Sequence, residues 1–264
     1  MTKNWQQLKV ETIRGVPVIS FQRPEKLNAL NSQLFREIKD AVEWLGEIAS
    51  SNAIIITGTG RGFIAGADLG EYGSSSAEDF EAFQALGQTV YDSLRDSELI
   101  IIAAVNGYAL GGGMEMVLAS DVVFSSSNAK LGLPEIGVGL LPGGGGTVYL
   151  RAFLPAQMAK DIILSGRLLT AEEARAIGLV QYVCEPDSLV ERAVNYGEAL
   201  NTRSPEALIE IKRALDPRHT HSFAEGLVKE RAAVMHLFGS ANGREGVGAF
   251  LEKRDPIFRR RGDA

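Results

Sequence analysis

The chain has 264 residues, 45% of them hydrophobic and 23% charged, which allows one sizeable globular core with an appended helical region. Its formal net charge of −6 argues against non-specific nucleic-acid binding. A single cysteine excludes an internal disulfide and, with three histidines, disfavours a Cys/His metal cluster. No apolar run has the length of a signal peptide or membrane span, so we expect a cytoplasmic protein without bound metal.

The first elements alternate between strand and helix patterns. Two short β-rich runs, 8–13 and 16–21, flank a glycine turn and predict a hairpin. After a loop, apolar residues at helical spacing predict a helix with Ser32 as its N-cap. The β-branched run 53–57 is apolar at nearly every position, which predicts a strand that is buried on both faces of a sheet.

The segment after that strand is rich in glycine. Residues 58–62 superficially resemble a dinucleotide-binding turn, but the glycine spacing fails and no helix pattern follows directly. Asp68 is placed to cap a short helix. Residues 70–79 are rich in Gly, Ser and acidic residues, which suits either a mobile lid or a surface loop. A helix is predicted over 80–95 and a strand over 100–105.

The stretch from Ala104 to Glu115 joins an apolar strand to a helix through three consecutive glycines. Glycines let a ligand approach the backbone N–H groups at the start of that helix, although a tight crossover packed by glycine gives the same pattern. After a strand predicted over 121–124, Glu135 lies in an apolar, glycine-rich stretch. Burial there would raise its pKa. The alternative is a carboxylate satisfied by backbone N–H groups in a turn.

From Pro155 onward helical patterns dominate. They cover residues 157–164, 171–177, 187–200, 205–215, 223–238 and 244–253. In the longest of these helices, one apolar stripe suits core packing or subunit contact; it consists of Phe223, Leu227, Val234 and Phe238. The histidines His219, His221 and His236 also fall in this half, and we interpret them as surface or packing residues. We expect a core domain over 1–200 and a helical region over 201–264.

The chemistry must come from backbone and carboxylates, because G-x-S-x-G, H-E-x-x-H and P-loop motifs are all missing. The candidates are the turns around Ala67 and Gly112, which present N–H groups, and the side chains of Glu115 and Glu135. Two N–H donors could hold a developing oxyanion, each contributing about 3–4 kcal/mol. With two carboxylates to move protons, this set suits enolate chemistry beside a carbonyl.

Four longer motifs follow one another along the chain. They are Arg-Pro-Glu-Lys-Leu-Asn-Ala-Leu at 23–30, Ala-Gly-Ala-Asp at 65–68, the glycine-rich stretch 106–115, and Pro-Glu-Ile-Gly at 134–137, which leads into 141–147. Together they resemble the enoyl-CoA hydratase/isomerase (crotonase) family over nearly the whole chain. The resemblance implies an α/β fold, a crotonase-like spiral of β-β-α units, with a helical C-terminal oligomerisation region that forms trimers, often paired into hexamers.

The resemblance also implies an acyl-CoA substrate, with coenzyme A as part of it, and no tightly bound cofactor. From the acidic net charge and the absence of a long apolar run we expect neither nucleic acid nor a membrane as partner. The thioester carbonyl would lie between the N–H groups of Ala67 and Gly112. In the hydratases one glutamate activates water for the β-carbon and the other exchanges the α-proton, roles that map onto Glu115 and Glu135 respectively. Further substrate or CoA contacts map onto Lys26, Leu27, Ala29, Ala65, Asp68, Leu69, Gly111, Pro142, Gly143, Phe250 and Lys253.

Because both glutamates are present, the leading interpretation is hydration of a 2-enoyl-CoA to a 3-hydroxyacyl-CoA. A double-bond isomerase, which could use Glu135 alone, is the alternative. A catalytically idle family member that serves as a binding protein is a third possibility, of a different class.

Some positions depart from the common hydratase pattern. Gly70 stands where many members have a lysine, which removes one contact to the CoA phosphates. Met114, Leu133 and Tyr149 also differ from the residues frequent in hydratases, and we expect these changes to alter the pocket lining. Lys253 matches a C-terminal lysine that in the family reaches a CoA phosphate from a neighbouring subunit.

Overall fold

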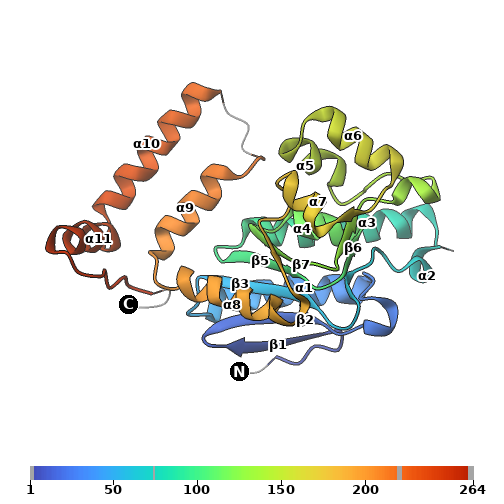
Figure 1. Cartoon of the computed structure of the whole chain (residues 1–264), viewed down its shortest axis with the longest axis horizontal. Helices are drawn as coiled ribbons and strands as arrows, with labels where there is room; N and C mark the ends of the chain where they lie inside the picture. Colours follow the sequence, from blue (N-terminus) through green and yellow to red (C-terminus); the bar gives the residue numbers. More distant parts are fainter. Residues whose placement is uncertain (1–2, 74, 219–221, 261–264) are drawn as a thin grey trace.

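Two β-sheets and the helices around them make up the computed structural model, which describes residues 3–73, 75–218 and 222–260 (Figure 1). The six-stranded sheet has the order β1-β2-β3-β5-β7-β10, and the four-stranded sheet has the order β4-β6-β8-β9. The strands are β1 (Leu8–Ile13), β2 (Val16–Phe21), β3 (Ala53–Gly58), β4 (Gly62–Ile64), β5 (Ile100–Val105), β6 (Tyr108–Leu110), β7 (Val122–Ser126), β8 (Lys130–Gly132), β9 (Leu169–Thr170) and β10 (Tyr182–Cys184).

Helices follow most strand pairs. The α-helices are α1 (Ser32–Ile48), α2 (Leu69–Tyr72), α3 (Ala77–Asp96), α4 (Gly112–Leu118), α5 (Gly146–Phe153), α6 (Ala156–Ser165), α7 (Ala171–Ala176), α8 (Leu189–Leu200), α9 (Pro205–Leu215), α10 (Phe223–Gly239) and α11 (Ala241–Glu252). Short 3-10 helices are η1 (Pro24–Lys26), η2 (Glu135–Val138) and η3 (Pro186–Ser188).

The chain crosses from one sheet to the other in each turn of a spiral. β3, β5 and β7 pair in parallel within the large sheet, and each is followed directly by a strand of the small sheet, namely β4, β6 and β8. A helix then returns the chain to the large sheet after β4 and β6, as α1 does after the first hairpin. The β-β-α units implied by the family resemblance are therefore present.

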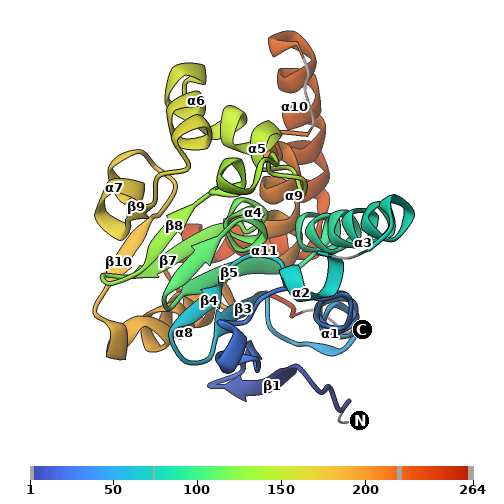
Figure 2. The same ribbon diagram turned by 90° about the vertical axis from the view of Figure 1, so that its right-hand side faces the viewer.

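The large sheet is buried on both faces. Ile54 and Ile56 of β3 belong to the main core, which includes residues of α1, α3 and the small sheet. Ile55 points the other way, into a second core built with α8, because successive strand side chains alternate between faces. This explains why the predicted strand over 53–57 is apolar throughout. Figure 2 shows α1 and α3 side by side next to the sheets.

Local predictions near the N-terminus are largely confirmed. The hairpin, the strands β3, β5 and β7, and the Asp68 cap, whose carboxylate accepts from the Gly70 N–H at 3.2 Å, are all present. Ser32 is wrong as the N-cap, because Asn31 holds that place and its side chain accepts from the Leu34 N–H. The described residues of the segment 70–79 lie on the surface, as expected, but α2 and the first turn of α3 make most of the segment helical rather than a loop.

The predicted helices of the second half are confirmed, with ends that differ by up to about three residues. Helix α5 was not predicted. It begins at Gly146, directly after a run of glycines, and such a run resembles a loop in sequence. The short strands of the small sheet, β4, β6, β8 and β9, were also missed, as was β10 of the large sheet, because their pairing depends on distant parts of the chain.

Helices α9, α10 and α11 form a C-terminal arm that stands apart from the body in Figure 1. α9 packs against β5, whereas α10 packs against α9 and α11. No described residue of α10 is buried, and Phe223 is 85% exposed. Core packing within one chain is thus excluded for the apolar stripe, whereas subunit contact stays a prediction. His236 is exposed on α10, and His219 and His221 lie outside the described residues.

Candidate active site

The small sheet brings three predicted site segments together. β4, β6 and β8 run parallel to one another, so their carboxyl ends meet at one edge of the sheet. β4 leads into the segment of Ala67, β6 into Gly112 and α4, and β8 into Glu135. Segments that are up to about 70 residues apart in sequence therefore converge on the same place.

A cavity of about 500 Å³ lies at this edge, and we call it the glutamate cavity. Of the predicted site residues, those that line it are Ala65, Ala67, Leu69, Gly111, Gly112, Glu115, Glu135 and Gly143. The remaining predicted residues do not line it; they are Lys26, Leu27, Ala29, Asp68, Pro142, Phe250 and Lys253.

Two backbone N–H groups at the cavity lack acceptors. Leu30 forms a parallel bridge with Ala67, in which Leu30 donates to Gly66 O at 2.8 Å and Asp68 donates to Leu30 O at 2.7 Å. The Ala67 N–H points away from this bridge. Gly112 is the first residue of α4, so its N–H has no partner within the helix. Neither N–H donates to an acceptor in the part of the chain that the structure describes.

Gly111 shapes the turn between β6 and α4. Its φ of +51° lies in the left-handed region, which disfavours residues with a side chain. A Cβ at this position would also lie 3.0 Å from Glu135 Oε1. The backbone conformation therefore favours glycine at this position, and a side chain would also displace the end of the Glu135 carboxylate.

Glu115 lies in the first turn of α4 and is 4% exposed. Its Oε1 accepts hydrogen bonds from the N–H groups of Gly144 at 2.7 Å and Gly146 at 2.8 Å. Burial raises the pKa of Glu115, while these two hydrogen bonds lower it. A Cβ on Gly144 would lie 2.2 Å from the Tyr91 ring and 2.5 Å from Glu115 Oε2. The glycine run therefore lets the backbone come close enough to hydrogen-bond the carboxylate.

Glu135 lies at the start of η2, and its Oε2 is buried without a hydrogen-bond partner among the described residues. Burial raises its pKa to about 7, the charge of Glu115 adds to that rise, and its own backbone N–H opposes it. The prediction that burial would raise this pKa is confirmed. The alternative, a carboxylate held by N–H groups of a turn, describes Glu115 better.

Tyr91 of α3 is a cavity residue that the sequence did not indicate. Its hydroxyl donates to Gly112 O at 3.1 Å, and burial, together with the charge of Glu115, raises its pKa well above the usual value. Phe83, Gln84 and Gly87 of the same helix also line the cavity. The helical pattern over 80–95 predicted α3, but the face that α3 turns to the cavity depends on its packing against α1.

The first motif, residues 23–30, shapes the loop beside the cavity without lining it with charge. Arg23 pairs with Asp68 at 2.8 Å and also donates to Ala29 O. Leu27 O accepts from the Ala65 N–H at 3.1 Å, whereas Lys26 is exposed. These contacts hold the segment of Ala67 in place from outside.

The expected change in pocket lining at Met114, Leu133 and Tyr149 is wrong. Met114 and Leu133 are buried in the main core, where their side chains pack against other apolar groups. Tyr149 faces a different cavity. The family pattern identified the unusual positions, but it did not indicate where their side chains lie.

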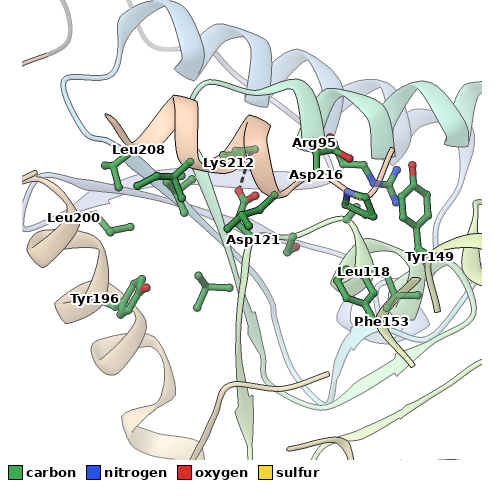
Figure 3. Close-up of a pocket in the computed structure, with 17 residues that line it drawn as sticks. Arg95, Leu118, Asp121, Tyr149, Phe153, Tyr196, Leu200, Leu208, Lys212 and Asp216 are labelled. Carbon is green, nitrogen blue, oxygen red and sulfur yellow. Dashed lines mark ion pairs between the residues drawn. The ribbon is translucent and has the colours of Figure 1, made fainter. Parts of the chain in front are cut away.

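That second cavity, about 420 Å³, lies between α9 and the body of the protein (Figure 3), and we call it the Lys212 cavity. Lys212 Nζ lies 2.8 Å from Asp121 and donates to Leu94 O and Leu99 O at 3.0 Å each. Burial lowers the pKa of Lys212 and raises that of Asp121, and their mutual attraction opposes both shifts. The pair ties α9 to the sheet.

Two kinds of feature were searched for over the described residues. No group of three or more His, Cys, Asp or Glu side chains lies close enough together to hold a metal ion. In the same part of the chain, no helix is long and apolar enough to cross a membrane.

Comparison with solved structures assigns the spiral to the crotonase class of folds. The crystal structure of an enoyl-CoA hydratase from Bacillus anthracis matches with a TM-score of 0.92 and 32% identity, over 96% of this chain and 99% of that chain. At this coverage the likeness extends to nearly the whole chain, including most of the C-terminal arm.

Sequence comparison gives the family. The model of the enoyl-CoA hydratase/isomerase family matches residues 11–261. A crotonyl-CoA hydratase of Syntrophomonas wolfei is 35% identical over 96% of this chain and 98% of its own length. A 2,3-dehydroadipyl-CoA hydratase of Escherichia coli is 36% identical, with 97% and 99% covered. The chain belongs to the enoyl-CoA hydratase/isomerase family, and it is an enzyme.

Proposed function

We propose that the protein adds water to the double bond of a 2-enoyl-CoA and releases a 3-hydroxyacyl-CoA. One observation carries the proposal: Glu115 and Glu135 line the same cavity as the unpaired N–H groups of Ala67 and Gly112. The hydratase names of similar proteins support it. Coenzyme A enters as part of the substrate, and the reaction needs no tightly bound cofactor.

The N–H groups of Ala67 and Gly112 receive the thioester oxygen. When water adds to the β-carbon, negative charge moves onto this oxygen and an enolate forms. N–H groups that are already fixed in position stabilise this charge without rearranging, and each contributes about 3–4 kcal/mol. The Leu30 bridge and the Tyr91 hydroxyl hold the two segments in place.

Glu115 acts as the base that activates water. The Gly144 and Gly146 N–H groups bind Oε1 and favour the ionised form. No described residue hydrogen-bonds Oε2, so this oxygen is free to accept a hydrogen bond from water. As the water oxygen bonds to the β-carbon, its proton passes to Glu115.

Glu135 acts as the acid that protonates the α-carbon. A pKa of about 7 keeps a large share of this carboxyl protonated near neutrality. Its proton goes to the α-carbon as the enolate collapses, and proton exchange with solvent then resets both glutamates. Hydration should therefore fall above about pH 7, where Glu135 loses its proton.

The direct test is incubation with 2-enoyl-CoA thioesters while the conjugated chromophore is followed. Loss of absorbance with formation of 3-hydroxyacyl-CoA supports the proposal. A protein that moves the double bond of a 3-enoyl-CoA but never adds water to a 2-enoyl-CoA would be an isomerase. One that binds acyl-CoA without either reaction would be a binding protein.

We further propose that residues 201–264 form an oligomerisation region on a core of residues 1–200, in a cytoplasmic trimer or hexamer. The exposed apolar side chains of the C-terminal arm support this; they include Phe223, Val228, Val234, Met235 and Phe238. Contact with a second subunit would remove this surface from water. Light scattering with Phe238→Glu as the variant tests it, since a smaller particle is expected.

A further inference from the structure

The wall of the glutamate cavity carries no positive charge. Among the described residues that line it, the ionisable side chains are Glu115, Glu135 and Tyr91, and no Lys, Arg or His is present. Gln84 is the other polar side chain of the lining. A ligand in this cavity therefore meets negative or neutral groups.

The cations near the cavity are engaged elsewhere. The charge of Arg95 lowers the pKa of Glu115, but its guanidinium lies over the Tyr149 ring at 3.5 Å and lines the Lys212 cavity (Figure 3). Arg23 pairs with Asp68, and both side chains are largely buried, at 13% and 15% exposure. Neither guanidinium lines the glutamate cavity.

The remaining wall is apolar. Phe35 of α1 and Phe83 of α3 pack together, with ring centroids 5.3 Å apart, and both line the cavity. Leu140 and Leu141 follow η2 in another part of the lining and are 43% and 67% exposed. A hydrocarbon tail that contacted these side chains would remove both surfaces from water.

We propose that the acyl tail of the substrate is uncharged and apolar, and that the enzyme rejects 2-enoyl-CoA thioesters whose tail ends in a carboxylate. The inference rests on the proposed function. A terminal carboxylate would lose its hydration without meeting a cation, and the charge of the ionised Glu115 would repel it. The relatives named for crotonyl-CoA and for 2,3-dehydroadipyl-CoA are 35% and 36% identical to this chain. Sequence identity therefore does not distinguish an apolar tail from one that ends in a carboxylate, whereas the residues that line the glutamate cavity favour the apolar tail.

A matched pair of six-carbon substrates tests the inference. 2-Hexenoyl-CoA and 2,3-dehydroadipyl-CoA share the reacting group, but the second carries a carboxylate in place of the terminal methyl. We expect kcat/KM for hexenoyl-CoA to be at least ~100-fold higher, the size of a like-charge repulsion across several ångströms in a partly dry site. Equal values, or a preference for the dicarboxylate, would overturn the inference.

A binding measurement separates failure of this inference from failure of the proposed function. Hexanoyl-CoA and adipyl-CoA have no double bond, so calorimetry reports their Kd values whether or not the enzyme hydrates anything. Tighter binding of hexanoyl-CoA by at least ~10-fold supports the apolar tail even if turnover is absent. Equal Kd values contradict the tail assignment even if hexenoyl-CoA is hydrated.

A reversal variant gives the sharpest result. Gln84→Arg places a cation in the lining, next to Gly143, where Gln84 Oε1 already approaches the position of a Cβ at 2.6 Å. We expect the ratio of kcat/KM values to move toward 2,3-dehydroadipyl-CoA by ~10-fold or more, while Gln84→Met, of similar length and uncharged, keeps the preference for hexenoyl-CoA. An unchanged ratio in a folded Gln84→Arg variant, checked by circular dichroism, would contradict the placement of the tail against this wall.

Discussion

The Lys212 cavity and the glutamate cavity differ in whether an ionisable side chain of each has a partner for its charge. In the Lys212 cavity, Lys212 is paired with Asp121 and with two backbone carbonyls. In the glutamate cavity, Glu135 Oε2 is buried without a hydrogen-bond partner in the described part of the chain, and burial raises the pKa of Glu135 to about 7. Arg95 Nη2 also finds no hydrogen-bond partner among the residues that the structure describes, but its guanidinium lies over Tyr149, which stabilises the cation.

This difference distinguishes a charged group that stabilises the fold from a carboxyl group that can transfer a proton. A buried charge with a matched partner stays ionised and connects two elements, so its loss weakens the fold. A carboxyl without a partner gains and loses its proton near neutral pH, which suits it to proton transfer at the expense of stability. Substitutions in the two cavities should therefore affect different measurements.

The largest effect is expected at the glutamates. Glu115→Gln and Glu135→Gln should each lower the turnover of 2-enoyl-CoA by roughly 10²–10⁴-fold. The double variant should be little worse than either single variant, since groups that act as a unit are not additive. Glu172→Gln, on the exposed surface of α7, is the matched control and should be unaffected.

Glu115 also separates the two candidate reactions. In an isomerase Glu115→Gln should leave substantial double-bond migration and α-proton exchange in deuterated water, while Glu135→Gln is crippling. The assignment as a hydratase is falsified if Glu115→Gln keeps full activity on 2-enoyl-CoA.

Breaking the ion pair of the Lys212 cavity should lower the stability of the fold rather than the turnover. Lys212→Met leaves the Asp121 carboxylate, which is 22% exposed, without its cation, and should lower the free energy of unfolding by about 1–3 kcal/mol, measured by urea denaturation. Arg175→Met breaks an exposed pair with Glu172 and should cost less than about 1 kcal/mol. If Lys212→Met kept full stability but lost turnover, the assignment of this cavity to structure would be wrong.

Loss of one N–H donor to the oxyanion should have the next largest effect. Gly112→Pro deletes one N–H and distorts the backbone, so turnover should fall by at least about 100-fold, measured as loss of the enoyl chromophore. Gly137→Pro is a poor control, because the Gly137 N–H donates to Pro134 O. Gly46→Ala on α1, where a Cβ meets nothing within 4 Å, is better and should leave turnover unchanged. Near-normal activity in folded Gly112→Pro would remove Gly112 from the site.

The cost of the unpaired carboxyl should appear as a pH dependence. Because the folded-state pKa of Glu135 is raised from 4.5 to about 7, its contribution to stability is fully present below about pH 4.5 and is lost as the pH rises through about 7. Glu135→Gln should therefore match the wild type in Tm near pH 5 and exceed it near pH 8. An equal difference at both pH values would show that Glu135 does not titrate in this way.

The smallest effect concerns Lys253, which ends α11 in an exposed, left-handed conformation. If it reaches a CoA phosphate of a neighbouring subunit, Lys253→Ala should raise KM severalfold for CoA thioesters but not for pantetheine thioesters, with a salt-dependent difference. Equal effects on both substrates would make it a packing residue.

Local sequence alone determined much of the fold and the identity of the two glutamates. The turn at Gly15, the apolar run of β3 and the helical spacing of α1 depend on near neighbours, so their elements were predicted correctly. The apolar surroundings of Glu135 likewise predicted its raised pKa. Four spaced motifs indicated the family, because a spaced set is far more specific than any glycine run.

Tertiary structure alone decided how those residues are held. Glu115 is bound by N–H groups 29 and 31 residues away, and Tyr91 reaches Gly112 from another helix. The unusual residues Met114 and Leu133 proved to be core residues rather than pocket residues. Hydrogen-bond partners and the direction of a side chain depend on the packing of distant segments, which spacing along the chain does not encode.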